Sequence, residues 1–137
     1  MIYLDSNILI YAFSQNVDTK QQQIKAVDIF EQLLTENKLY ISDISLFEFA
    51  FVSKKINEQS ENIKDNLNFL KNYIELSKPI ILNRTIEIMN ELKMYNNSFD
   101  CFHIAFAEHY CNKIITYDKG FRKFKKITDL NIEILKI

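Results

Sequence analysis

Glycine and proline are almost absent from this 137-residue chain, which has one of each, Gly120 and Pro79. Phosphate-binding loops of the dinucleotide and P-loop types need several glycines at fixed spacing, so both kinds of nucleotide site are excluded. The hydrophobic content of 47% and the charged content of 26% are those of a compact domain that buries its own core. We therefore expect a single domain over residues 1–137.

Cysteine and histidine are also scarce. Cys101 and Cys111 lie ten residues apart in a segment predicted to form one helix, and that length of helix spans about 15 Å, too far for a disulfide. His103 and His109 have no metal-ligand spacing, which disfavours a structural zinc site and indicates structural roles for both histidines. These patterns predict free thiols and a reducing, cytoplasmic setting.

Long hydrophobic runs are missing as well. The longest apolar stretch, residues 44–52, is interrupted by Glu48, and residues 1–4 contain no basic leader. Neither a membrane span nor a signal peptide is predicted.

Short apolar runs alternate with helical periodicity along the chain. The runs at 2–4, 39–41, 114–116 and 132–135 predict strands, and helical patterns lie between them, one of them over residues 63–74. Asn37 offers a helix stop, Ser42 and Ser98 are predicted N-caps, and Pro79 separates the 63–74 pattern from a short apolar run at 80–82. This alternation predicts a three-layer α/β fold with a mostly parallel central sheet and helices on both faces.

Four acids interrupt stretches that otherwise predict buried core: Asp5, Glu48, Asp100 and Asp118. Acids are almost never fully buried unless they are paired or bind a metal. Asp5 and Asp118 follow strands, where ligands of open α/β sheets collect, and Asp100 lies in the first turn of its helix. Glu48 shares a helix face with apolar neighbours. We expect the four carboxylates to meet in one crevice.

Carboxylates gathered in a crevice repel one another, and a divalent cation removes that conflict. Oxygen ligands match Mg²⁺ or Mn²⁺ better than zinc or copper. Ser6, Asn7 and Thr116 are candidates to support the acids or to position water. Hydrolysis of a phosphodiester bond is the reaction that such a site favours.

Each acid also has a purely structural explanation. Asp5 could cap the next helix, and Asp118 could belong to a turn before Gly120. Glu48 could pair with a lysine, and Asp100 could be an ordinary early-helix acid. Together these explanations require four independent coincidences.

A basic segment follows the last of the four acids. Residues 113–126 contain six basic side chains and one acid, a local net charge of +5, so the remaining residues sum to −6. Lys119, Arg122 and Lys123 are candidates for contact with the phosphate backbone of a nucleic acid. A solvated helix face is the alternative for such a run.

Four segments of the chain each contain one of the acids: 2–7, 41–48, 99–105 and 114–121. Through these segments the chain resembles PIN-domain proteins of the VapC type, which are the ribonuclease toxins of bacterial and archaeal toxin–antitoxin pairs. The resemblance covers essentially the full length. Ser6 stands where many members have threonine, which keeps the hydroxyl.

The resemblance implies a metal held by Asp5, Asp100 and Asp118, with Glu48 supporting, and an endoribonuclease activity of these four residues on RNA. It also implies a homodimer and a small antitoxin that covers the active site. A housekeeping PIN-type RNA-processing nuclease and a non-catalytic PIN-fold binding module stay open as alternatives.

Two other classes fit less well. A phospho-acceptor receiver domain needs an adjacent acidic pair after its first strand, but Ser6 and Asn7 follow Asp5 here. A phosphatase with an aspartate nucleophile needs a second acid two residues later, where this chain has Asn7.

Overall fold

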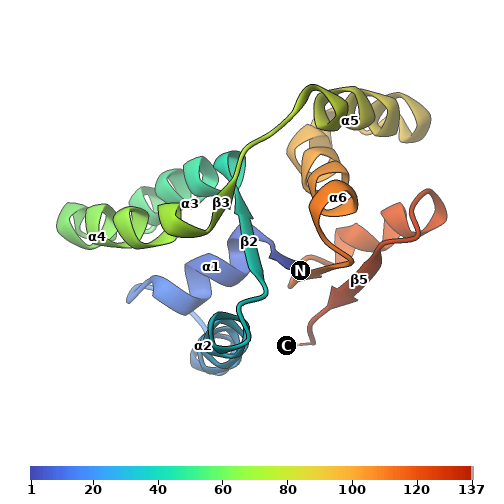
Figure 1. Cartoon of the computed structure of the whole chain (residues 1–137). Coiled ribbons are helices and arrows are strands. Elements are labelled where there is room, and N and C mark those ends of the chain that lie inside the picture. The colour runs from blue at the N-terminus through green and yellow to red at the C-terminus, as the bar shows by residue number, and fades with distance from the viewer. Residues whose placement is uncertain (137) are drawn as a thin grey trace.

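Five parallel strands form the centre of the molecule (Figure 1), in the order β3-β2-β1-β4-β5. The computed structural model describes residues 1–136. The strands are β1 (Ile2–Leu4), β2 (Leu39–Ser42), β3 (Ile74–Glu75), β4 (Lys113–Thr116) and β5 (Asn131–Ile134). The four predicted strands are confirmed, and the sheet is parallel throughout.

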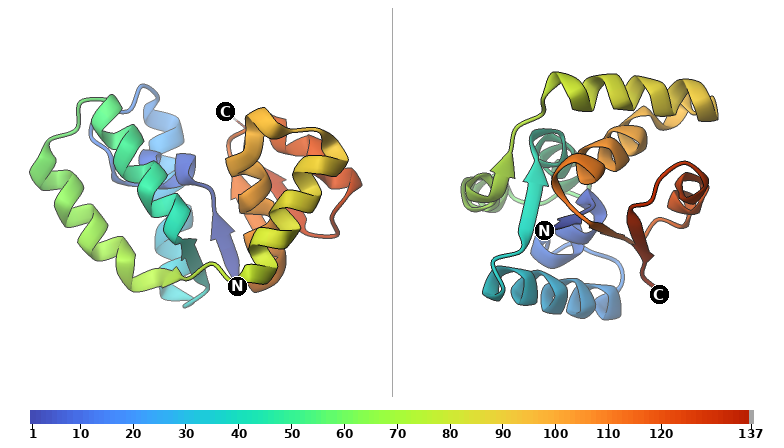
Figure 2. Two further views of the ribbon diagram at one scale, coloured as in Figure 1. Left: turned by 90° about the horizontal axis from the view of Figure 1, so that it is seen from above. Right: turned by 45° about the vertical axis from the view of Figure 1, so that its right-hand side comes forward.

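Helices cover both faces of the sheet, as predicted. They are α1 (Ser6–Phe13), α2 (Lys20–Thr35), α3 (Asp43–Lys55), α4 (Ser60–Leu70), α5 (Pro79–Leu92) and α6 (Ser98–Tyr110), with 3-10 helices η1 (Lys71–Tyr73), η2 (Tyr95–Asn97) and η3 (Lys119–Lys126). Figure 2 shows α1 to α4 gathered away from the group formed by α5, α6 and η3. None of the helices in the described part of the chain has the length and apolar character that a membrane crossing requires.

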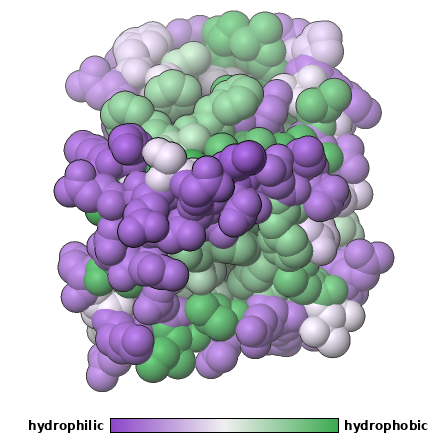
Figure 3. Space-filling model, turned by 90° about the vertical axis from the view of Figure 1, so that its left-hand side faces the viewer, coloured by the Kyte–Doolittle hydropathy of each residue, from purple (hydrophilic) through white to green (hydrophobic). Residues whose placement is uncertain are grey.

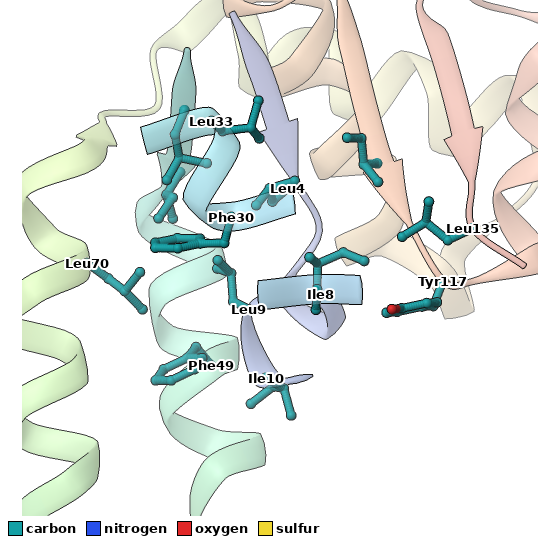
Figure 4. Packing of buried hydrophobic residues seen from close by; sticks show 14 residues of the cluster. Leu4, Ile8, Leu9, Ile10, Phe30, Leu33, Phe49, Leu70, Tyr117 and Leu135 are labelled. Carbon is teal, nitrogen blue, oxygen red and sulfur yellow. The ribbon is translucent and has the colours of Figure 1, made fainter. Parts of the chain in front are cut away.

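The strands supply side chains to two separate cores because successive residues of a strand face opposite sides. Leu4 and Ile115 pack with α1 to α4 in the core drawn in Figure 4, whereas Tyr3 and Ile114 pack with α5, α6 and η3. All of these side chains are almost completely buried, and burial of one large apolar side chain contributes about 1.5–3 kcal/mol. The two cores fix the sheet between its helical layers.

Several helix boundaries follow from local chemistry. The Ser42 hydroxyl accepts a hydrogen bond from the backbone N–H of Ser45 at 3.0 Å, which confirms the predicted cap of α3. Asn37 adopts a left-handed conformation with φ of 55° just after α2, as a helix stop requires. Cys101 in α6 and Cys111 just beyond it are free thiols, as predicted.

Two local predictions are wrong, and the apolar run at 80–82 turns out to be helical. Ser98 is the first residue of α6 and not its cap, because the preceding η2 already brings the chain into helical geometry and Asn97 occupies the cap position. Ile74 belongs to β3, since α4 ends at Leu70 and η1 turns the chain back to the sheet. Residues 80–82 form the first turn of α5, because Pro79 at the start of a helix lacks only an N–H that would have no partner there.

The order of the strands creates a switch point between β1 and β4. From β1 the chain builds outward through β2 and β3 on one side, then crosses over to place β4 and β5 on the other. At such a point the connections leave in opposite directions and open a crevice at the carboxyl ends of the strands. Asp5 directly follows β1, and Asp118 lies two residues after β4.

Candidate active site

Asp5 lies at the switch point with its carboxylate held on both sides. Its side chain caps α1 by accepting the Ser6 N–H at 2.7 Å on Oδ1, and the Thr116 hydroxyl donates to Oδ2 at 2.7 Å. Asp5 is only 5% exposed. Burial raises the pKa of Asp5, although the charge of His103 and the two hydrogen bonds oppose the rise. The two hydrogen bonds therefore orient the carboxyl group of Asp5, while burial makes its ionisation unfavourable.

Thr116 links Asp5 to the segment that carries Asp118. The Asp118 N–H donates to the Thr116 hydroxyl oxygen at 2.9 Å, and the Asn7 amide nitrogen donates to the same oxygen at 3.2 Å. The Asn7 oxygen accepts from the Tyr117 N–H at 3.3 Å. Asn7 thus ties α1 to the end of β4, while its proposed role toward water stays a prediction.

Glu48 projects from α3 toward the same place. Its Oε1 lies 2.6 Å from His103 Nε2 and accepts the Ser6 hydroxyl at 3.3 Å. The Ser6 hydroxyl also lies 3.5 Å from Asp5 Oδ1 and so stands between the two acids. A lysine was the alternative, purely structural partner considered for Glu48, but the residue that pairs with Glu48 is His103.

His103 is the residue that sequence reasoning missed at this site. It is buried and paired, as predicted for a structural histidine, yet it contacts the acid cluster. Burial lowers its pKa, but the hydrogen bond to Glu48 and the charges of Asp5, Glu48 and Asp100 outweigh this, so the pKa is raised. When the ring is protonated, its charge offsets part of the negative charge of the acids. Its position three residues after Asp100, on one helix face, was the available signal.

A buried hydroxyl network orients the histidine from behind. The Tyr3 hydroxyl lies 2.6 Å from His103 Nδ1, 2.8 Å from Ser42 Oγ and 2.6 Å from Ser45 Oγ. When the ring is protonated, Nδ1–H donates to Tyr3 and the Tyr3 hydroxyl donates onward to a serine. Two strands, β1 and β2, and two helices, α3 and α6, are joined by this network.

Asp100 completes the group from the first turn of α6, where it is half-buried. Burial, followed by the charges of Asp5, Asp118 and Glu48, raises its pKa to about 6, and only His103 opposes the rise. Asp100 is therefore close enough to the other three acids to be repelled by each of them, although the four arise from separate segments.

Ionisation of Asp100 should cost stability in metal-free protein. Its folded pKa of about 6 lies above the ordinary 3.8, so this share of stability is present below pH 4 and is lost as the pH rises through 6. We expect the unfolding free energy of Asp100→Asn, relative to wild type, to be higher at pH 7 than at pH 4. Urea titrations in EDTA at the two pH values measure this, and an unchanged difference would contradict it.

The acids do not close on a single point. Within residues 1–136, no three His, Cys, Asp or Glu side chains form a ready-made metal cage. Asp118 is exposed and folds back to accept the Gly120 N–H at 2.7 Å, where a Cβ on Gly120 would lie 3.0 Å from Oδ1. Mg²⁺ usually takes one or two carboxylates and keeps several waters. The mutually repelling oxygen donors fit such an ion.

The predicted basic residues lie just beyond Asp118 on η3. Lys119, Arg122 and Lys123 are all exposed, while Phe121 and Phe124 anchor the helix in the core. In a 3-10 helix, residues three apart align. Lys119 and Arg122 therefore share one row, and Lys123 falls in another.

Comparison with known proteins places this arrangement in context. The family model of the PIN domain matches residues 2–127. Among curated proteins, none shows significant sequence similarity to the chain.

Solved structures share the fold over the whole length. The chain is similar to VapBC2 from Rickettsia felis bound to a DNA fragment from its promoter, with 23% identity, a TM-score of 0.69, and coverage of 99% of this chain and 100% of the other. It is also similar to a toxin–antitoxin complex from Klebsiella pneumoniae, with 22% identity, a TM-score of 0.67 and full coverage of both chains. FitAcB from Neisseria gonorrhoeae gives 16% identity, a TM-score of 0.69, and coverage of 97% and 96%.

Proposed function

The chain belongs to the PIN domain family, and from that premise we propose that it is a metal-dependent endoribonuclease, the toxin of a type II toxin–antitoxin pair acting in the cytoplasm. The observation that carries the proposal is the buried carboxylate of Asp5 at the switch point, with Glu48 on the other side of the Ser6 hydroxyl and Asp100 within reach of the charges of all three other acids. A structural role does not require four acids to share a crevice against their own repulsion.

In this proposal, Asp5, Asp100 and Asp118 hold Mg²⁺ or Mn²⁺. The bound ion would supply an activated water and stabilise the leaving 3′-oxygen of the phosphodiester. The protein's own contribution is orientation. Thr116 and the Ser6 N–H fix the two oxygens of Asp5, and Ser6 spaces Asp5 from Glu48.

Glu48 and His103 adjust the charge of the site. His103 lies 2.6 Å from Glu48 and, when its ring is protonated, compensates that acid; its charge also eases ionisation of Asp5 and Asp100. Glu48 then acts as an outer support that holds water or Ser6. Asn7 keeps the end of β4 in register with α1.

Metal removal tests the proposal directly. Purified protein is expected to cut single-stranded RNA with Mg²⁺ or Mn²⁺ present and to stop in EDTA, because the repelling carboxylates alone cannot activate water. Gel analysis of cleavage and thermal unfolding with and without Mg²⁺ measure the effect. Added Mg²⁺ should raise the melting temperature, since it relieves repulsion in the folded state only. Undiminished cleavage in EDTA would exclude this mechanism.

An antitoxin segment is the proposed occupant of the apolar cavity beside Glu48. Phe47, Phe51 and Phe99 are 58–69% exposed and line a cavity of about 620 Å³ that also contacts Ser6 and Glu48. A peptide seated there would reach the acids with a basic side chain. A short reading frame for a DNA-binding protein, adjoining or overlapping this gene, would support a toxin role over general RNA processing.

A second copy of the chain is the proposed partner of another apolar surface. Leu76, Ile80, Leu82 and Ile86, in and just before α5, are 44–66% exposed. Figure 3 views the molecule from the side of α4 and shows hydrophobic surface above a hydrophilic band, in the upper part of the molecule, where α5 lies in Figure 1. Apolar exposure of this kind marks an interface, and light scattering would give the mass of a dimer.

A further inference from the structure

A polar cavity lies between the end of α5 and η3, outside the acid cluster. It has a volume of about 350 Å³, and Lys93, Lys123 and Lys126 line it together with Tyr95, Asn96 and Asn97. We refer to it as the lysine pocket. Three positive charges enter it, and no acid belongs to its lining.

The geometry of η3 explains why two of the lysines converge. Phe121 and Phe124 are fully buried and fix one row of the 3-10 helix against the core. Lys123 and Lys126 are also three residues apart, so they lie together on the neighbouring face of the same 3-10 helix. Lys93 is the residue that ends α5, in a left-handed conformation with φ of 53°, and its side chain also lines the pocket.

These lysines have no internal counter-charge. The Lys and Arg side chains that form ion pairs within residues 1–136 are Lys38, Arg84 and Lys113. Lys126 also lines a neighbouring cavity, together with Arg84 and Lys125, and there Glu91, Glu108 and Asp129 balance the positive charges. Lys93 and Lys123 do not line that cavity, so an anion in the lysine pocket would meet their charge.

The lysine pocket borders the proposed active site through two segments. Asn97 lies three residues before Asp100, within about one helical turn. Lys123 lies five residues after Asp118, about 10 Å along a 3-10 helix. A strand of RNA whose phosphate lies at the acids would extend a short distance to reach the lysines.

The pocket also offers a surface for a base. Tyr95 is 58% exposed, and its hydroxyl donates to Asn90 Oδ1 at 3.0 Å, which holds the ring in place. Single-stranded nucleic acids bind where cationic side chains meet aromatic faces, and amides such as those of Asn96 and Asn97 read base edges.

We propose that the lysine pocket binds one nucleotide of single-stranded RNA beside the acids, with Lys93 and Lys123 on its phosphate and Tyr95 stacked on its base. The proposal rests on the ribonuclease function proposed above and adds a substrate subsite to it. Lys123 keeps its predicted RNA contact, whereas Lys119 and Arg122 lie in a different row.

Binding can be measured without cleavage. The Asp5→Asn protein in EDTA is titrated into a fluorescein-labelled single-stranded RNA at several salt concentrations, and anisotropy gives the affinity. Adding Lys93→Gln and Lys123→Gln should reduce the salt slope by about 1.4, which at 0.1 M salt corresponds to roughly 25-fold weaker binding. Lys125→Gln is the matched control for Lys123→Gln alone, since each removes one charge from η3. Because Lys125 lies outside the pocket, its variant should bind more nearly as the parent does.

Tyrosine variants test the base contact separately. Tyr95→Ala should weaken binding roughly fivefold or more without changing the salt slope, and Tyr95→Phe should restore it. Affinity and slope of the double lysine variant equal to those of Lys125→Gln would overturn the proposal. A second result would also overturn it: the double lysine variant binds RNA as the parent does but loses affinity for a polyglutamate peptide. That result would indicate that the pocket binds an acidic protein. Cleavage by the wild type decides the ribonuclease function independently.

Discussion

Asp5→Asn should abolish RNA cleavage while leaving the fold intact. Asparagine keeps the cap of α1, because it caps helices as well as aspartate does, and it can still accept from Thr116. It removes the charge that would hold a cation at the switch point. Loss of one precisely aimed electrostatic group lowers kcat by roughly 10²–10³, so we expect at least about a hundredfold loss, measured as initial cleavage rates in Mg²⁺.

Stability separates this result from simple unfolding. Burial raises the pKa of Asp5, so the ionised side chain is unfavourable in metal-free protein. Asp5→Asn should therefore melt in EDTA at the wild-type temperature or above it, and Mg²⁺ should shift its melting less. Asp28→Asn makes the same chemical change at an exposed position of α2 and should leave the cleavage rate unaltered. An Asp5→Asn protein that cuts at the wild-type rate would refute the site.

His103→Ala should be the most destabilising single change in this region. The change leaves a cavity where a side chain only 1% exposed was packed, and it removes one hydrogen-bond partner each from the Tyr3 hydroxyl and from Glu48. Core truncation together with stranded polar groups costs about 3 kcal/mol or more. Urea unfolding at neutral pH measures the loss.

His109→Ala is the control for this prediction, because His109 lies six residues further along α6 and is exposed. A surface substitution of this kind changes stability by about 0.5 kcal/mol or less. Equal effects of the two histidine variants would show that the buried network with Tyr3, Ser42 and Ser45 does not support the fold.

The positions of the acids could be predicted because strand ends are visible in sequence. Apolar runs that stop at Asp5 and shortly before Asp118 place both at one edge of a parallel sheet, whatever the details of the loops. The two-residue strand β3 could not be predicted, since Ile74 also continues the helical spacing of α4. Only packing against β2 decides between those outcomes.

The surroundings of His103 needed three-dimensional information. Tyr3, Ser42 and His103 are separated by 39 to 100 residues, and each is unremarkable in its own segment. The row structure of η3 was equally hidden, because a basic run gives the same pattern in an α-helix and in a 3-10 helix. Sequence thus located the carboxylates, while the histidine and the grouping of the lysines required coordinates.

The position of β1 in the middle of the sheet has a consequence for protein synthesis. Residues 2–4 are synthesised more than a hundred residues before residues 113–115, with which they pair. The edge between β1 and β4 can therefore form only after residue 115 has been translated. A product released before residue 113 lacks β4, Thr116 and Asp118, so it cannot assemble the proposed site.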